Sequence, residues 1–134
     1  NPEGKRWSLG INKPVDDSTH TANEIQTVLH ITNRGIATSG NYRNFYYKGG
    51  KKYAHTIDPK TGYPVEHSLL SATVIAPTCA QADAYATSFM VMGLEAARQF
   101  VGQHKDLQTY LIYADSQGQL RTWMSAGMSK YIQP

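Results

Sequence analysis

The stretch that decides the fold runs from Leu69 to Gly93 and reads LLSATVIAPTCAQADAYATSFMVMG. Its first part, Leu69–Ala76, is a short apolar run that predicts a buried strand. Thr78, followed by Gln81 three residues later, matches the capping box found at helix N-termini. Gly93 is a suitable end for that helix, because glycine is favoured at C-terminal caps. The stretch therefore predicts a strand that leads directly into a capped helix.

The predicted helix carries an apolar stripe and, at its edge, two oxygen-bearing side chains. Asp83 and Thr87 are four residues apart, so they project together and are expected to be half-buried. A carboxylate and a hydroxyl in this arrangement suit Mg²⁺ better than zinc or copper. From these residues alone, a simpler interpretation is that Asp83 complements the helix dipole and Thr87 bonds back to a carbonyl. The stripe, formed by residues three and four apart, consists of Cys79, Ala82, Ala86, Phe89 and Met90.

The only cysteine of the chain belongs to this stripe. Cys79 cannot form an internal disulfide, because the sequence contains one cysteine. Its place among apolar residues predicts that it is buried as a small hydrophobic side chain.

A second polar segment, His55 to Gly62, reads HTIDPKTG. Residues 51–57 alternate as in a strand, so His55 shares a face with apolar neighbours. Pro59 ends that strand because it has no N–H, and Gly62 can adopt a positive φ. The segment predicts a tight loop that can wrap a ligand. From these residues alone, an ordinary turn beside a hydrogen-bonded strand histidine is the simpler interpretation.

The remaining pattern predicts one module, residues 1–134, with an α+β (α/β) fold. A second helix is expected over residues 94–101, ended by Gly102. Gly49-Gly50 and residues 115–118 are typical hairpin turns. The two helices are expected to cover one face of a largely antiparallel sheet. The other candidate strands are 7–11, 26–32, 42–48, 51–57, 107–114 and 119–125, and residues 128–134 have no clear assignment.

Composition and charge allow one alternative of a different class. The chain has 134 residues, 40% of them hydrophobic, and a formal net charge of +3, and no stretch has the apolar length needed to span a bilayer. Residues 42–53 interleave basic and aromatic side chains, which could describe a nucleic-acid-binding β-hairpin. Lysines beside a glycine turn are also typical of any exposed edge hairpin, and we favour that interpretation.

Three segments occur in order along the chain: ATSGNY at 37–42, HTIDPKTGYP at 55–64 and ADAYAT at 82–87. Together they resemble the C-terminal half of the FAD:protein FMN transferases, the ApbE family. A linked set of motifs of this kind is far more specific than a lone glycine pattern.

The resemblance implies a reaction and roles for particular residues. Members transfer FMN from FAD to a Thr or Ser hydroxyl of a target flavoprotein through a phosphoester bond, release AMP, and depend on Mg²⁺. By resemblance, Asp83 and Thr87 would bind the metal. His55 would be the catalytic base and, with Ile57, Asp58 and Thr61, would border the flavin nucleotide.

The first of the three segments is expected to contribute less. Ser39, Gly40 and Asn41 would border the pocket. Position 41 is often acidic in the family, and Asn41 lacks that charge, so we assign it no catalytic role.

The resemblance also implies what lies outside this chain. The N-terminal half of the family fold is absent from these 134 residues, so we expect the chain to be inactive by itself. The implied partners are FAD, the target flavoprotein and the missing half, with no nucleic acid. The implied location is the periplasm, where an N-terminal lipid would anchor the protein to the inner membrane. An FAD pyrophosphatase and a passive flavin-binding module remain alternatives.

Overall fold

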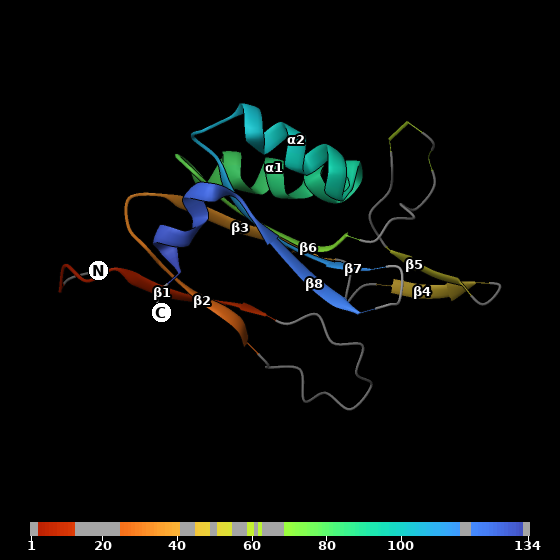
Figure 1. Ribbon diagram of the computed structural model, residues 1–134, viewed down its shortest axis with the longest axis horizontal. Helices are drawn as coiled ribbons and strands as arrows, with labels where there is room; N and C mark the ends of the chain where they lie inside the picture. The colour runs from red at the N-terminus through yellow and green to blue at the C-terminus, as the bar shows by residue number, and fades with distance from the viewer. Residues whose placement is uncertain are drawn as a thin grey trace.

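The computed structural model describes residues 3–12, 25–40, 45–48, 51–54, 59–60, 62, 69–115 and 119–132. Strands and helices follow one another as expected for an α+β fold (Figure 1). The elements are β1 (Trp7–Asn12), β2 (Ile25–Ile31), β3 (Gly35–Gly40), β4 (Phe45–Lys48), β5 (Lys51–Ala54), β6 (Leu69–Ala76), α1 (Cys79–Met92), α2 (Leu94–Gln103), β7 (Gln108–Ala114), β8 (Leu120–Met124) and the 3-10 helix η1 (Ala126–Tyr131).

A four-stranded antiparallel sheet in the order β3-β6-β7-β8 forms the middle layer. Both α-helices lie on one face of this sheet, which confirms the predicted architecture (Figure 1). The opposite face is covered by the β1–β2 hairpin, whose two strands were predicted, and by η1, which was not predicted. The described part of the chain therefore has three layers with two buried interfaces.

Strand alternation explains how β6 serves both interfaces. Val74 and Ala76 pack with the helices, whereas Ile75 packs with the hairpin layer. Successive strand residues point to opposite faces, so a strand covered on both sides becomes apolar throughout. The whole of β6 except Leu70 is buried, in agreement with the continuous apolar run in the sequence. This continuous apolar run is why β6 could be predicted from the sequence.

The helix begins at the N-cap that the sequence predicted, Thr78. The backbone N–H of Gln81 donates to the Thr78 hydroxyl at 3.2 Å, and Thr78 has the extended backbone of an N-cap. The buried face of the helix is formed by Ala82, Ala86, Phe89 and Met90, as predicted.

Cys79, in contrast, is exposed, so its predicted burial is wrong. Cys79 is the first residue of α1, and its backbone lies against Gly35 at the start of β3. A side chain at position 35 would collide with the backbone of Thr78 and Cys79. The helix thus touches the sheet through its main chain at this point, and the Cys79 side chain turns outward.

Gly93 joins the two helices without a linker. It ends α1 with φ 85° and is also the N-cap of α2. The predicted end of α2 at Gly102 is wrong, because the helix continues to Gln103. The His104 ring stacks on Phe100 at 4.0 Å between ring centroids, and its Nδ1 lies 2.8 Å from the Phe100 carbonyl oxygen. These contacts stabilise the last turn of α2, which extends past Gly102.

The outer elements differ more from the prediction. Strand β3 was not predicted, because GIATSG lacks apolar alternation. Helix η1 was also missed, although its Met128 is fully buried in the hairpin layer. Strands β4 and β5 pair with Phe45 opposite Ala54, as expected of a hairpin around the two glycines, which lie outside the described residues. Among the described helices, none combines the length and apolarity needed to cross a membrane.

Candidate functional site

A cavity of about 600 Å³ brings together parts of two of the three sequence motifs. Pro59 and Lys60 come from the HTIDPKTG segment, and Thr87 comes from the ADAYAT segment on α1. Gly62, in the same loop, has φ 72°, the positive value predicted for a tight turn. Two segments that are far apart in the sequence therefore border one hollow. The remaining lining residues are Ser88, Val91, Met92 and Ala96.

Asp83 and Thr87 lie on the exposed side of α1, so the prediction that they are half-buried is wrong. The buried face is centred on Ala82 and Ala86, each one residue earlier. One residue turns a helix by about 100°, which carries Asp83 and Thr87 away from the sheet. Their spacing of four still places both oxygen-bearing groups together on one helix face.

Neither of these side chains has a partner within the described part of the chain. The neighbouring Ser88 hydroxyl donates to the Ala84 carbonyl at 2.7 Å, which is the back-bonding considered for Thr87. No such bond engages Thr87, and no described cation forms an ion pair with Asp83. Both oxygen groups are therefore accessible to a ligand.

The described part of the first motif, residues 37–40 on β3, lies at the same end of the molecule as the cavity. Strand β6 pairs antiparallel with β3, and α1 returns from the end of β6, so α1 and β3 run in the same direction (Figure 1). Gly35 contacts the start of α1, and Ser39 and Gly40 follow at the far end of β3. Ser39 and Gly40 consequently lie toward the second half of the helix, which carries Thr87.

The described residues can supply only part of the coordination shell of a Mg²⁺ ion. No cluster of three His, Cys, Asp or Glu residues occurs in the described ranges. Asp83 and Thr87 supply one carboxylate and one hydroxyl, both hard oxygen donors. Mg²⁺ commonly uses one or two protein oxygens and completes its shell with water and substrate phosphates. The two residues fit that pattern and do not fit a closed zinc site.

The other predicted site residues cannot be placed. His55, Ile57, Asp58, Thr61 and Asn41 lie outside the described residues. The roles predicted for these residues stay predictions.

The sequence motifs did not indicate the apolar wall of the cavity. Val91, Met92 and Ala96 flank Gly93, where α1 turns into α2. Met92 is 38% exposed where it lines the cavity. The signal that could have found this wall is the apolar VMG run at the helix end, which continues beyond the buried stripe.

Comparison with known proteins connects this geometry to one family. The sequence profile of the ApbE family matches residues 1–111. The chain is 46% identical over 132 residues to the FAD:protein FMN transferase of Klebsiella pneumoniae, and 43% identical to that of Escherichia coli K12. Each match covers 98% of this chain and 36% of the relative, so the chain spans about a third of the length of these proteins.

Solved structures agree in fold. The flavin transferase ApbE from Vibrio cholerae superposes with a TM-score of 0.78 at 30% identity, covering 98% of this chain and 39% of that one. The ApbE protein of Thermotoga maritima gives 0.77 at 22% identity, covering 100% and 40%. The family profile matches most of the chain, the relatives named above are 43–46% identical to it, and the fold is shared. The chain belongs to the ApbE family.

Proposed function

We propose that this chain forms part of an enzyme that transfers FMN from FAD to a Thr or Ser hydroxyl of a target flavoprotein, with release of AMP. The observation that supports the proposal is the shared cavity, in which Pro59 and Lys60 of one family motif meet Thr87 of another. The relatives are named FAD:protein FMN transferases, and this name supplies the reaction class of the proposal.

The bond changes define what the site has to do. The acceptor hydroxyl oxygen attacks the phosphorus of the FMN half of FAD, and the new P–O bond is the phosphoester. The P–O bond to the AMP half breaks, and AMP leaves with its electron pair. Such phosphoryl transfers depend on positioning and on stabilisation of oxygen charge, and they need no covalent enzyme intermediate.

We assign Asp83 and Thr87 to holding Mg²⁺, and their accessible oxygens support this role. When bound, the ion would neutralise charge on the diphosphate oxygens. On the resemblance, His55 takes the proton of the acceptor hydroxyl, a role suited to an imidazole near neutral pH. Lys60 at the cavity rim adds positive charge on the side where an anionic diphosphate would lie.

Replacement of the proposed base gives the sharpest test. In the intact enzyme, His55→Ala should reduce FMN transfer roughly 10²–10⁴-fold, the usual contribution of general base catalysis. FAD binding, followed by flavin fluorescence, should stay within a few-fold of the wild type. An unchanged transfer rate in this variant would remove His55 from the mechanism.

Hydrolysis of FAD is the competing activity, because water can take the place of the acceptor hydroxyl. The two activities differ in product. Transfer yields AMP and a flavin-labelled acceptor protein in equal amounts, whereas hydrolysis yields AMP and free FMN. Measurement of AMP release with and without acceptor protein distinguishes them, and a passive flavin-binding module would release no AMP in either case.

The family resemblance also underlies a proposed location. We propose that the intact protein works in the periplasm, held at the inner membrane by an N-terminal lipid. Cell fractionation with an antibody against this chain tests the proposal, and recovery from the cytoplasm would contradict it.

A further inference from the structure

The layer formed by β1, β2 and η1 carries positive charge and, in its described part, no acidic side chain. The ranges 4–12, 25–40 and 126–132 contain no Asp or Glu. A surface with charge of one sign creates a field that attracts ions of the opposite sign. The Lys and Arg side chains in these ranges, which we call the basic edge, are Lys5, Arg6, Arg34 and Lys130.

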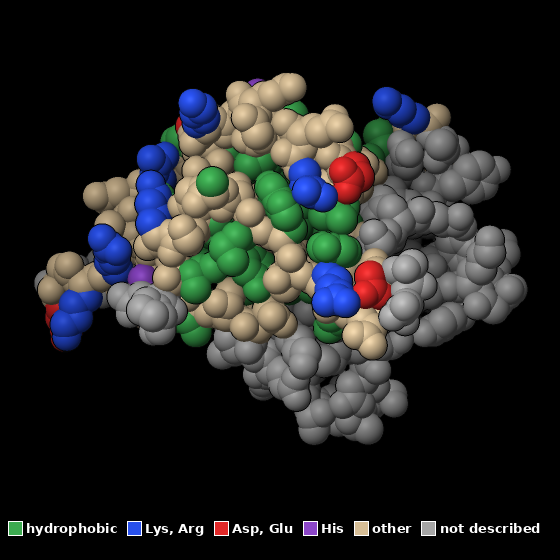
Figure 2. All heavy atoms as spheres, in the orientation of Figure 1, with side chains coloured by type: hydrophobic (Ala, Val, Ile, Leu, Met, Phe, Trp, Pro, Cys, Tyr) green, Lys and Arg blue, Asp and Glu red, His purple; other side chains and the backbone are tan. Residues whose placement is uncertain are grey.

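Strand pairing brings the basic edge together at one end of the layer. Trp7 pairs with Ile31 in the β1–β2 register, so the segment before β1 and the turn after β2 lie at the same end of the hairpin. Leu29 forms a bridge with Ile132, so the end of η1 lies beside the same part of β2. Figure 2 shows Lys and Arg side chains gathered along the side of the molecule where β1 begins.

Ion pairs neutralise little of this charge within the described part of the chain. Lys5 pairs with Glu3 at 2.9 Å, but both side chains are at least 70% exposed. Exposed pairs of this kind contribute little and are screened by salt. No described carboxylate pairs with Arg6, Arg34 or Lys130. Because burial of unpaired cations against protein is costly, the basic edge is suited to water or to an anionic surface.

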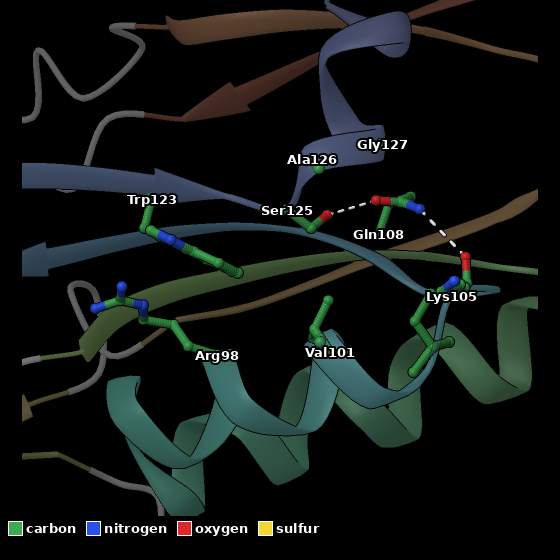
Figure 3. A pocket seen from close by; sticks show the side chains of 10 residues that line it. Arg98, Val101, Lys105, Gln108, Trp123, Ser125, Ala126 and Gly127 are labelled. Carbon is green, nitrogen blue, oxygen red and sulfur yellow. Dashed lines mark hydrogen bonds between the residues drawn. The ribbon is translucent and has the colours of Figure 1, made fainter.

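The cations beside α2 have different surroundings. Arg98 and Lys105 border a cavity between α2 and β8 (Figure 3). Arg98 pairs with Glu95 at 3.2 Å and lies over the Trp123 ring, and Lys105 is followed directly by Asp106. Acidic groups therefore accompany the cations on this side of the sheet, whereas the basic edge has only Glu3.

Two aromatic side chains lie among the cations of the basic edge. Trp7 is 55% exposed, more than any other large hydrophobic side chain in the described ranges. On η1, the Lys130 ammonium lies 5.1 Å from the centroid of the Tyr131 ring. Trp and Tyr have an apolar body and a polar group, so they suit the boundary between lipid and water, where Lys and Arg reach the headgroups. This combination favours a lipid surface as the partner.

We propose that the basic edge rests on a membrane surface that contains anionic lipids, with the Trp7 ring at the level of the headgroups. Each Lys or Arg near such a surface strengthens binding roughly fivefold, and the attraction extends about one Debye length. The inference is independent of the proposed reaction. It adds to the proposed location a face of the folded chain, which an N-terminal lipid by itself would not orient.

Vesicle binding tests the proposal. The intact enzyme, produced without lipid, is mixed with vesicles of phosphatidylcholine alone or of equal parts phosphatidylcholine and phosphatidylglycerol, and bound protein is measured by flotation. Binding to the anionic vesicles should be at least about tenfold tighter and should be lost as salt is added. Equal binding to both vesicles, or binding to neither, would overturn the proposal. FAD is left out, so the result does not depend on the transfer reaction.

A matched pair of variants separates the basic edge from net charge. Arg6→Glu combined with Arg34→Glu should weaken binding to the anionic vesicles at least about tenfold. Arg98→Glu combined with Lys105→Glu makes the same change in net charge beside α2 and should retain most of the binding. Circular dichroism and urea unfolding identify any variant that fails to fold. Equal loss in the two double variants would overturn the assignment of this surface.

The aromatic contact and the identity of the partner have tests of their own. Trp7→Ala should weaken binding to the anionic vesicles several-fold, whereas Val28→Ala, at an exposed position on β2, should not. Equal binding by these two variants would overturn the placement of Trp7 at the headgroups. Tighter binding to a single-stranded oligonucleotide than to the vesicles, lost in the Arg6 and Arg34 double variant, would identify nucleic acid as the partner and overturn the proposal.

Discussion

The two faces of α1, a helix of fourteen residues, make different contributions to the protein. Ala82, Ala86 and Phe89 face the sheet and are fully buried, while Asp83 and Thr87 face solvent beside the cavity. The small alanines allow the helix to approach β3 and β6 closely. One helix thus supplies both a core surface and the exposed oxygen groups that we propose as metal ligands, and a shift of one residue separates the two faces.

The largest expected effect on stability comes from the buried side. Phe89→Ala should lower the free energy of unfolding by about 3–5 kcal/mol, because it leaves a cavity beneath Tyr85 and Phe100. Urea unfolding measures the change. Met92→Ala is the control on the same helix, and its partly exposed side chain should cost far less. Equal losses would mean that the two sides of α1 do not differ in packing.

The contact between α1 and β3 comes next. Gly35→Ala places a methyl group against the backbone of Thr78 and Cys79, and we expect a loss of about 1–3 kcal/mol from overpacking. Gly102→Ala is the control, because nothing lies near a side chain at that helical position. It should be neutral or slightly stabilising in thermal unfolding. A tolerated alanine at position 35 would show that the start of the helix can move away from the strand.

The helix cap should have a smaller effect. Thr78→Ala removes the acceptor for the Gln81 N–H and should cost about 1 kcal/mol. Thr78→Ser retains the hydroxyl and should restore most of the stability in the same urea titration. If serine fails to restore it, the cap hydrogen bond is not the source of the loss.

The exposed side should have the smallest effect on stability and the clearest effect on ligand binding. Asp83→Asn and Thr87→Ala should change the free energy of unfolding by no more than about 0.5 kcal/mol, as is usual for exposed sites. In the intact enzyme, the same changes should weaken Mg²⁺ binding measured by calorimetry. Ser88→Ala, at a neighbouring cavity residue whose hydroxyl is already bonded, serves as the control. Unchanged Mg²⁺ affinity in both variants would remove them from the metal shell.

The central elements could be predicted from sequence because their signals are local. The strand Leu69–Ala76 and the start of α1 at Thr78 agree with the prediction, since a continuous apolar run and a capping box need no knowledge of tertiary contacts. Strand β3 has no comparable signal and depends on pairing with β6. The exposure of Cys79 depends on how the helix start meets Gly35, which is a tertiary contact.

The site could be predicted only in part, because residue spacing on a helix is a local signal and the packing of the helix is not. The spacing of Asp83 and Thr87 fixed their common helix face, but not the rotation of that face relative to the sheet. That rotation follows from the packing of Phe89 and Met90 in the core. The apolar wall at Val91, Met92 and Ala96 arises from the bend between two helices, which no single motif encodes.

Gly93 joins the two helices that form the apolar wall of the cavity. Val91 and Met92 precede it and Ala96 follows it, so the angle between the helices determines the width of the opening. A side chain here would be strained at φ 85°. Relief of that strain would rotate one helix against the other and change the width of the opening. The shape of this cavity can therefore be changed through the main chain, by a residue that does not line it.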